Sequence, residues 1–272
     1  MNFLHAAVLG IIQGLTEFIP VSSSGHLVLF QRIFAINDPS FFFDVMLHAG
    51  TLLAVFVVLW KDIWAIIKKP IQPVTAFLVL GTIPMVIFAL IFRRPIEGLF
   101  SSGSFLGFSF LITSLLLCIS EIFIRKTQKK PEKDSINTGA LSWSSLSYKD
   151  AVIIGLFQAI AIIPGVSRSG ATILGALSRK LDRDTAARFS FLLSIPAILG
   201  ALVLHLAELF TGTASGSDIS VNSGLSIIIG TIVSALVGFF AVRFMLKIIR
   251  EKSLLIFAVY TFILGILVLI IF

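Results

Sequence analysis

Long apolar segments separated by short polar stretches dominate the pattern of hydrophobic and polar positions along this chain. Six of these segments approach the length of about 20 residues that an α-helix needs to cross a lipid bilayer. They cover residues 42–60, 74–92, 104–124, 186–208, 224–242 and 253–272. The pattern therefore predicts an all-α, polytopic membrane protein with six transmembrane helices.

Two further apolar regions, residues 2–36 and 150–179, are each interrupted by a stretch rich in proline, serine and glycine. The interruptions fall at residues 20–25 and 164–170, and the limb after each one reaches polar residues before it is long enough to span. Irregular backbone is tolerated at membrane depth only where protein or a water-filled cavity covers it. Each region is therefore predicted to form a re-entrant helical hairpin.

The two predicted hairpins contain copies of one sequence. Residues 10–29 recur at residues 155–174 with a constant offset of 145, and seven of the twenty positions are identical. The ionisable residues are divided between the copies, because Glu17 and His26 occur only in the first and Arg168 only in the second. Such a division is expected of a duplicated protein in which both copies contribute to one site.

Each half of the chain then contains one hairpin and three spans. Because three is an odd number, the two halves insert in opposite orientations, which is the inverted-repeat plan of proteins whose broken helices meet near the bilayer midplane. We expect the first repeat at residues 1–124, a cytoplasmic and flexible linker at 125–149, and the second repeat at 150–272.

The basic residues agree with this orientation. If residues 125–149 are cytoplasmic, 17 of the 21 Lys and Arg residues lie in cytoplasmic loops, as the positive-inside rule requires. The outer side keeps Arg32, Arg93 and Arg94. The net charge of +7 therefore reflects membrane orientation, and nucleic acid is not an expected partner. Cys118 is the single cysteine, which excludes an internal disulfide.

Both interruptions have the composition of an anion-binding helix start. Serine and glycine at a helix N-terminus leave backbone N–H groups free, and the helix dipole adds partial positive charge there, so phosphate is the usual ligand. Arg168 adds a guanidinium, which grips phosphate oxygens in a bidentate way. The predicted substrate-binding residues are Gln13, Ser22, Ser24, Gly25, Ser167, Ser169 and Gly170.

Glu17 does not fit simple anion binding, because a carboxylate repels phosphate unless a divalent cation lies between them or the carboxyl group does proton chemistry. Gln13 lies four residues earlier on the same helix face, and both side chains are predicted ligands of Mg²⁺ or Ca²⁺. Alternatively, Glu17 orients a nucleophile. Either Ser23 or His26 would attack phosphorus, or His26 would serve as acid and base. The predicted catalytic residues are Glu17, Ser23, His26 and Arg168.

Each of these groups also has a purely structural interpretation. The serines of the first interruption would then only cap a helix, and His26 would only make an interhelical hydrogen bond. In the same interpretation Glu17 and Arg168 would form a structural salt bridge. Asp44 and His48, four residues apart at the start of a span, either flank the pocket or lie at the membrane interface.

The segments QGLTEFIPVSSSGH at residues 13–26 and PGVSRSGAT at residues 164–172 resemble motifs of the undecaprenyl-diphosphate phosphatase family, also called bacitracin resistance proteins. The resemblance covers the whole chain in length, hydropathy and repeat plan. It implies an integral enzyme of the bacterial cytoplasmic (inner) membrane that removes one phosphate from undecaprenyl diphosphate. The product is the lipid carrier recycled for peptidoglycan synthesis, and the enzyme confers resistance to bacitracin, which binds the diphosphate form.

By position, the resemblance makes Glu17 the acidic catalytic residue, Ser23 and His26 the nucleophile candidates, and Arg168 the phosphate-binding arginine. It also implies a divalent cation and a site that opens to the outer, periplasmic side. Many members have Glu where this chain has Gln13, which puts a metal site with two carboxylates in doubt here. The expected partners are the polyprenyl diphosphate lipid and the membrane, and a homodimer is left open.

A transporter or flippase for a polyprenyl phosphate lipid is the alternative function. Inverted repeats with broken helices are the plan of many transporters, and a fold does not fix a function. The two functions differ in their chemistry, since a flippase would move its lipid without releasing phosphate. It would also tolerate the loss of Ser23 or His26 better than the loss of Arg168.

Overall fold

The computed structural model describes residues 2–36, 41–92, 105–127, 143–211 and 221–272, together with residues 95, 96 and 98. All regular secondary structure in these residues is helical, so the predicted all-α class is confirmed. Two features of the sequence lie outside the described residues, namely the outer pair Arg93 and Arg94 and the part of the predicted linker at 128–142.

The helices follow one another along the chain in two similar series. The first half contributes α1 (Phe3–Thr16), α2 (Ser23–Ile33), α3 (Phe41–Val58), α4 (Trp60–Lys68), α5 (Pro73–Ile91) and α7 (Leu106–Thr127). After a 3₁₀ turn at Trp143–Ser145, the second half contributes α8 (Tyr148–Ile160), α9 (Arg168–Ser178), α10 (Arg183–Thr211), α11 (Val221–Glu251) and α12 (Leu255–Ile271).

The predicted spans are met in part. Four of the described helices, α5, α7, α10 and α11, are long and apolar enough to cross a membrane. Helices α3 and α4 count as a fifth span only if they are taken together, because the chain bends by 82° between them. Helix α12 is apolar but has only 17 residues. The chain is thus a multi-pass membrane protein with four to five candidate spans among the described residues.

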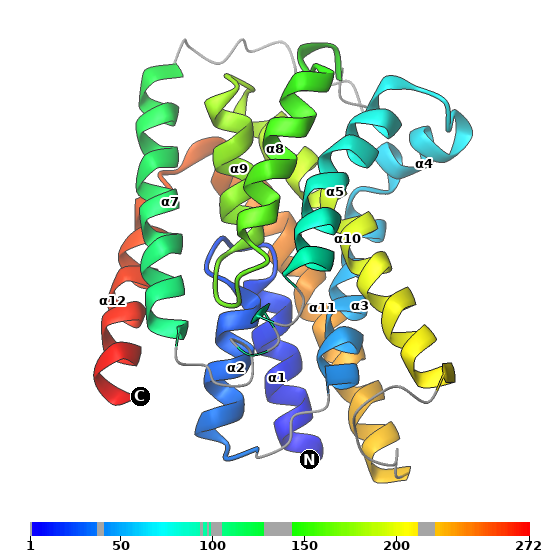
Figure 1. Cartoon of the computed structure of the whole chain (residues 1–272), viewed down its shortest axis with the longest axis vertical. Coiled ribbons are helices and arrows are strands. Elements are labelled where there is room, and N and C mark those ends of the chain that lie inside the picture. Colours follow the sequence, from blue (N-terminus) through cyan, green and yellow to red (C-terminus); the bar gives the residue numbers. More distant parts are fainter. Residues whose placement is uncertain are drawn as a thin grey trace.

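Both predicted breaks separate two helices, and the resulting hairpins point at each other. Figure 1 shows α1 and α2 entering from one end of the molecule and α8 and α9 from the opposite end, with the two connecting tips in the middle. The offset of 145 maps α2 at 23–33 onto 168–178, which are the bounds of α9. Ser22 and Ser167 begin these helices, and the hydroxyl of each accepts from the backbone N–H three residues later, as N-cap serines do.

Glycine allows the first limb of each hairpin to pack closely against a long helix. A Cβ at Gly10 of α1 would lie 2.6 Å from the carbonyl oxygen of Gly230 in α11, and a Cβ at Gly155 of α8 would lie 2.5 Å from that of Gly81 in α5. No side chain fits at such distances without a shift of backbone. Gly10 and Gly155 are one of the identical pairs of the repeat, so the same contact is built twice.

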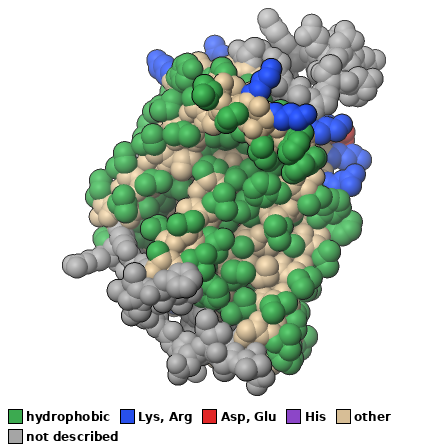
Figure 2. Space-filling model, turned by 90° about the vertical axis from the view of Figure 1, so that its right-hand side faces the viewer, with side chains coloured by type: hydrophobic (Ala, Val, Ile, Leu, Met, Phe, Trp, Pro, Cys, Tyr) green, Lys and Arg blue, Asp and Glu red, His purple; other side chains and the backbone are tan. Residues whose placement is uncertain are grey.

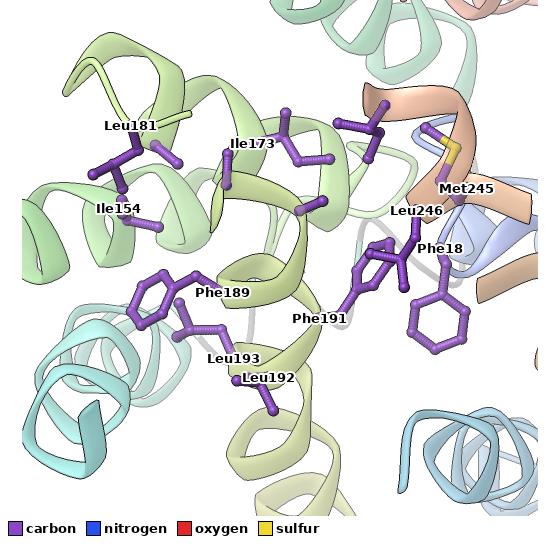
Figure 3. Close-up of a cluster of buried hydrophobic side chains, with 14 of the residues drawn as sticks. Phe18, Ile154, Ile173, Leu181, Phe189, Phe191, Leu192, Leu193, Met245 and Leu246 are labelled. Atoms are coloured by element: carbon purple, nitrogen blue, oxygen red, sulfur yellow. The ribbon is translucent and has the colours of Figure 1, made fainter. Parts of the chain in front are cut away.

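Apolar side chains from both halves form the main core around the second hairpin. Phe18, which follows Glu17 in the first tip, packs edge-on against Phe191 of α10 with ring centroids 5.2 Å apart. Met245 and Leu246 of α11 belong to the same cluster. Figure 3 shows these side chains together. Burial of this cluster fixes the first tip against helices of the second half, because apolar area removed from solvent is the main stabilising term.

Charged side chains gather at the end of the molecule that carries α4. Figure 2 shows Lys and Arg at this end of the viewed face and an apolar surface below it. Here Arg188 of α10 donates to the buried Asp62 of α4 at 2.9 Å. Arg179, at the end of α9, donates to Asp150 at 2.6 Å. Burial alone would raise the pKa of the Asp150 carboxyl, but hydrogen bonds from Ser147 and Arg179 hold this pKa below its usual value.

Candidate active site

An ion pair joins the two tips. A guanidinium nitrogen of Arg168, the first residue of α9, donates to Oε1 of Glu17, the residue that follows α1. The Glu17 side chain is only 4% exposed and that of Arg168 18%. The repeat predicted that its divided ionisable groups share one site, and the structure brings these two into direct contact.

The second oxygen of Glu17 collects donors from the first hairpin and from α3. Its Oε2 accepts from the hydroxyl of Ser23 at 2.5 Å and from Nε2 of Gln13 at 2.9 Å. Nε2 of His48 lies 3.5 Å from the same oxygen. Because Nδ1 of His48 already donates to the carbonyl of Asp44 at 2.8 Å, this last contact becomes an ion pair only when the ring is protonated.

Two polar atoms at this cluster are buried and have no hydrogen-bond partner among the described residues. They are Oε1 of Gln13 and Nη1 of Arg168. Unpaired buried polar groups are rare in proteins because each one loses its hydration. One is an acceptor and the other a charged donor, so the site offers an oxygen ligand for a cation and an N–H group for an anion.

His26 lies in α2 but does not contact Glu17. Its Nδ1 is 2.7 Å from the carbonyl oxygen of Ser22, and its Nε2 is 2.7 Å from the hydroxyl of Tyr260 in α12. The ring stacks on Tyr260 and meets Phe110 of α7 edge-on. Both nitrogens of this buried ring are therefore occupied.

Helix α7 holds the second tip, which bonds in turn to the first. The hydroxyl of Thr113 accepts from the N–H of Ser167 at 3.0 Å and donates to the carbonyl of Gly165 at 3.3 Å. The N–H of Gly165 donates to the hydroxyl of Ser24 in the first tip at 3.2 Å. Gly165 has a φ of +86° and packs on Ser109, so a side chain there would be both strained and crowded.

Among the predicted substrate-binding residues, only Gln13 contacts Glu17, and the serines and glycines form caps and contacts within and between the tips. Gln13 lies in the cluster around Glu17. The N–H groups of Gly25 and Gly170, which were expected to face phosphate, are taken by the serine caps of their own helices. Ser167 and Ser169 are buried, with their hydroxyls 3.3 Å apart, and Ser24 holds the other tip.

Three residues that form hydrogen bonds or an ion pair with the tips were not among the predicted site residues. The spacing of four residues between Asp44 and His48 is the only sequence signal for His48. Thr113 and Tyr260 lie in predicted spans with no motif around them, and they reach the tips only through the packing of α7 and α12.

The fold and the site define a class, which is a polytopic membrane protein with a buried carboxylate, a buried serine and a partly buried arginine where two hairpin tips meet. The profile of the family described as bacitracin resistance protein BacA matches residues 6–267, so the chain belongs to this family. The resemblance seen in the two motifs is thereby confirmed.

Named relatives are similar along their full length. Undecaprenyl-diphosphatase 4 of Bacillus thuringiensis subsp. konkukian (strain 97-27) is 45% identical over 99% of this chain and 97% of its own. Undecaprenyl-diphosphatase of Carboxydothermus hydrogenoformans is 43% identical over 99% of this chain and 97% of its own. Undecaprenyl-diphosphatase of Chloroherpeton thalassium is 36% identical over 98% of this chain and 95% of its own.

Proposed function

We propose that this protein is an undecaprenyl-diphosphate phosphatase, which hydrolyses its lipid substrate to undecaprenyl phosphate and inorganic phosphate. The observation that carries the proposal is the hydrogen bond from the Ser23 hydroxyl to Glu17, beside the guanidinium of Arg168. A hydroxyl bonded to a base next to a cation is the arrangement of an activated nucleophile at an anion site. The names of the relatives favour hydrolysis over the transporter alternative.

In the proposed reaction Ser23 is the nucleophile. Its oxygen attacks the terminal phosphorus while Glu17 accepts the hydroxyl proton, and the bridging oxygen leaves with undecaprenyl phosphate. Water then cleaves the phosphoserine and releases inorganic phosphate. Arg168 neutralises charge on the transferred group, since positioning and charge neutralisation do most of the work in phosphoryl transfer.

We further propose that Glu17 and Gln13 hold the divalent cation, Mg²⁺ or Ca²⁺. The buried, unpartnered Oε1 of Gln13 is the kind of oxygen ligand that these hard cations take, and Mg²⁺ commonly completes its shell with substrate phosphates and water. Substrate and water would have to supply the rest, because no group of three His, Cys, Asp or Glu side chains that could hold a metal occurs among the described residues. When bound, the cation would neutralise charge on the diphosphate.

Gln13→Glu tests this metal site. A second carboxylate next to Glu17 attracts a divalent cation more strongly, so the Mg²⁺ concentration for half-maximal activity is expected to fall about ten-fold or more. Mg²⁺-dependent thermal stabilisation of the purified variant should shift in parallel, which reports binding without turnover. An unchanged Mg²⁺ dependence in both measurements would remove Gln13 from the site.

The inverted repeat and its orientation in the membrane are also part of the proposal. The equal bounds of α2 and α9 under one offset, and the repeated contact of Gly10 and Gly155, support a duplicated unit. The Lys and Arg side chains at the α4 end support a cytoplasmic position for that end. We propose that the site opens to the outer side of the membrane. The enzyme would recycle the lipid carrier for cell-wall synthesis and confer bacitracin resistance.

Labelling with a membrane-impermeant maleimide checks the orientation. In a Cys118→Ser background, Phe272→Cys places a thiol at the end where both termini lie (Figure 1), and Lys69→Cys places one next to α4. In intact spheroplasts only Phe272→Cys is expected to react, and both should react after permeabilisation. Reaction of Lys69→Cys in intact spheroplasts would reverse the proposed topology.

The function itself is tested by phosphate release. Purified protein with undecaprenyl diphosphate or the C15 analogue farnesyl diphosphate and Mg²⁺ should release inorganic phosphate, and Ser23→Ala should abolish the release. The same preparation in vesicles distinguishes a flippase, which would move the lipid with its diphosphate intact. Transport without phosphate release would overturn the proposal.

A further inference from the structure

The contact between Tyr260 and His26 joins the first motif to a part of α12 that no motif marks. The two residues are 234 positions apart, and the phenol oxygen lies 2.7 Å from Nε2 of the imidazole. The rings are stacked at an interplanar angle of 8°. The histidine is 3% exposed, whereas Tyr260 is 46% exposed on α12.

The proton positions in this contact follow from the other side of the ring. Nδ1 faces the carbonyl oxygen of Ser22 at 2.7 Å, and a carbonyl can only accept, so Nδ1 carries the hydrogen. In the neutral ring Nε2 is then an acceptor, and the Tyr260 hydroxyl donates to it. An imidazole held in this way has no free nitrogen with which to attack phosphorus.

The carbonyl that His26 holds belongs to a strained residue. Ser22 has a φ of 74° and a ψ of 96°, a region that residues with a side chain rarely adopt. Such a conformation persists only where its surroundings fix it, and the bond from His26 is one of its restraints. The next residue is Ser23, whose hydroxyl is 2.5 Å from Glu17. The direction of the Ser23 side chain therefore depends on the Ser22 backbone.

We propose that Tyr260 is a positioning residue that acts on Ser23 through His26 and the Ser22 carbonyl. The tyrosine fixes the plane of the imidazole, the imidazole clamps the strained backbone, and the backbone aims the serine hydroxyl at Glu17. His26 is then a clamp and neither attacks the substrate nor carries its proton. The inference rests on the proposed function, since it concerns how the nucleophile is presented to the diphosphate.

A pair of substitutions at His26 separates the clamp from chemistry. In His26→Asn the side-chain amide can replace Nδ1 as donor to the Ser22 carbonyl. His26→Ala has no side-chain donor and leaves this carbonyl only the backbone N–H of residue 26, at 3.2 Å. We expect His26→Ala to lower kcat about 100-fold and His26→Asn to stay within about ten-fold of the original protein, because misplacement of a reacting group costs this much. A nucleophile or proton carrier would be lost equally in both variants, so equal inactivity of both would overturn the inference.

Tyr260→Phe tests the positioning role of Tyr260. It keeps the ring stack but loses the hydroxyl, and kcat should fall about ten-fold with KM nearly unchanged. Added to His26→Asn, the same substitution should have no further effect, because the residue through which it acts is gone. Tyr148→Phe is the matched control, since Tyr148 is the only other tyrosine and packs on Phe77, away from the tips.

The outcomes for Tyr260 and for the phosphatase proposal are distinct. If the original protein releases no phosphate, the proposed function fails. If it releases phosphate and Tyr260→Phe keeps the original kcat, or lowers it equally in the His26→Asn background, only the positioning role of Tyr260 fails. Thermal unfolding of each variant in detergent shows whether a loss of kcat comes from a loss of folded protein.

Discussion

Alanine in place of Arg168 is expected to lower kcat/KM for the diphosphate by about three orders of magnitude or more, the effect of removing a charge-neutralising arginine from phosphoryl transfer. The substitution removes both the buried, unpartnered Nη1 and the nitrogen that pairs with Glu17. It also leaves the Glu17 carboxylate buried without its partner, which costs about 3–5 kcal/mol in such pairs. Phosphate release by the purified variant measures the loss.

Arg179→Ala is the matched control for Arg168→Ala. It also removes an arginine that pairs with a carboxylate, Asp150, but this pair lies at the far end of α9. It is expected to reduce stability slightly and to leave kcat/KM within about two-fold, since partly exposed ion pairs contribute little. Equal activity of Arg168→Ala and the original protein would show that the pair with Glu17 is only a structural salt bridge.

The second large effect is expected for Glu17→Gln. The substitution keeps the size of the side chain but removes the base that accepts the Ser23 proton, so kcat should fall by about 10²–10⁴. The affinity for a diphosphate-like ligand, in contrast, should rise. Because the carboxylate no longer competes for Arg168 or repels the substrate, a non-hydrolysable diphosphonate should bind about ten-fold more tightly when divalent cations are removed.

The two readouts of Glu17→Gln separate its proposed roles. Glu121→Gln serves as the control, because Glu121 is also a buried carboxylate with an arginine partner but lies on α7 beside Leu254, away from the tips. Normal turnover in Glu17→Gln would end the assignment of the base. Weaker binding of the diphosphonate without cation would contradict competition between Glu17 and the substrate for Arg168.

The tips were predictable from the sequence because the information about them is local. Serine and glycine start a helix through contacts within three residues. The two breaks also lie at matching positions of the repeat, with an offset of 145, so each one supports the prediction of the other. The repeat also predicted that Glu17 and Arg168 share one site, since neither has an ionisable counterpart at the matching position of the other copy. The two hairpins enter from opposite ends, and their tips bring these two residues into contact.

The rest of the site depends on packing between distant segments, and no local pattern encodes it. Thr113 and Tyr260 sit in apolar helices, where a hydroxyl group is common for many reasons. The 82° bend after α3 falls where the predicted span at residues 42–60 ends, and α4 beyond it was not predicted as a helix. Serine capping is a structural alternative in the sequence analysis only for the first interruption, yet the structure shows it at both Gly25 and Gly170. The sequence alone does not determine whether a hydroxyl or a phosphate accepts from an N–H group at a helix start.

The most direct test of a single site shared by both tips is the structure of this protein bound to farnesyl methylenediphosphonate and Mg²⁺. The terminal phosphorus is expected within reach of the Ser23 hydroxyl, with the Arg168 guanidinium on the same phosphonate group and Glu17 behind the serine. A diphosphonate bound far from either Ser23 or Arg168 would contradict the shared site and the reaction proposed for it.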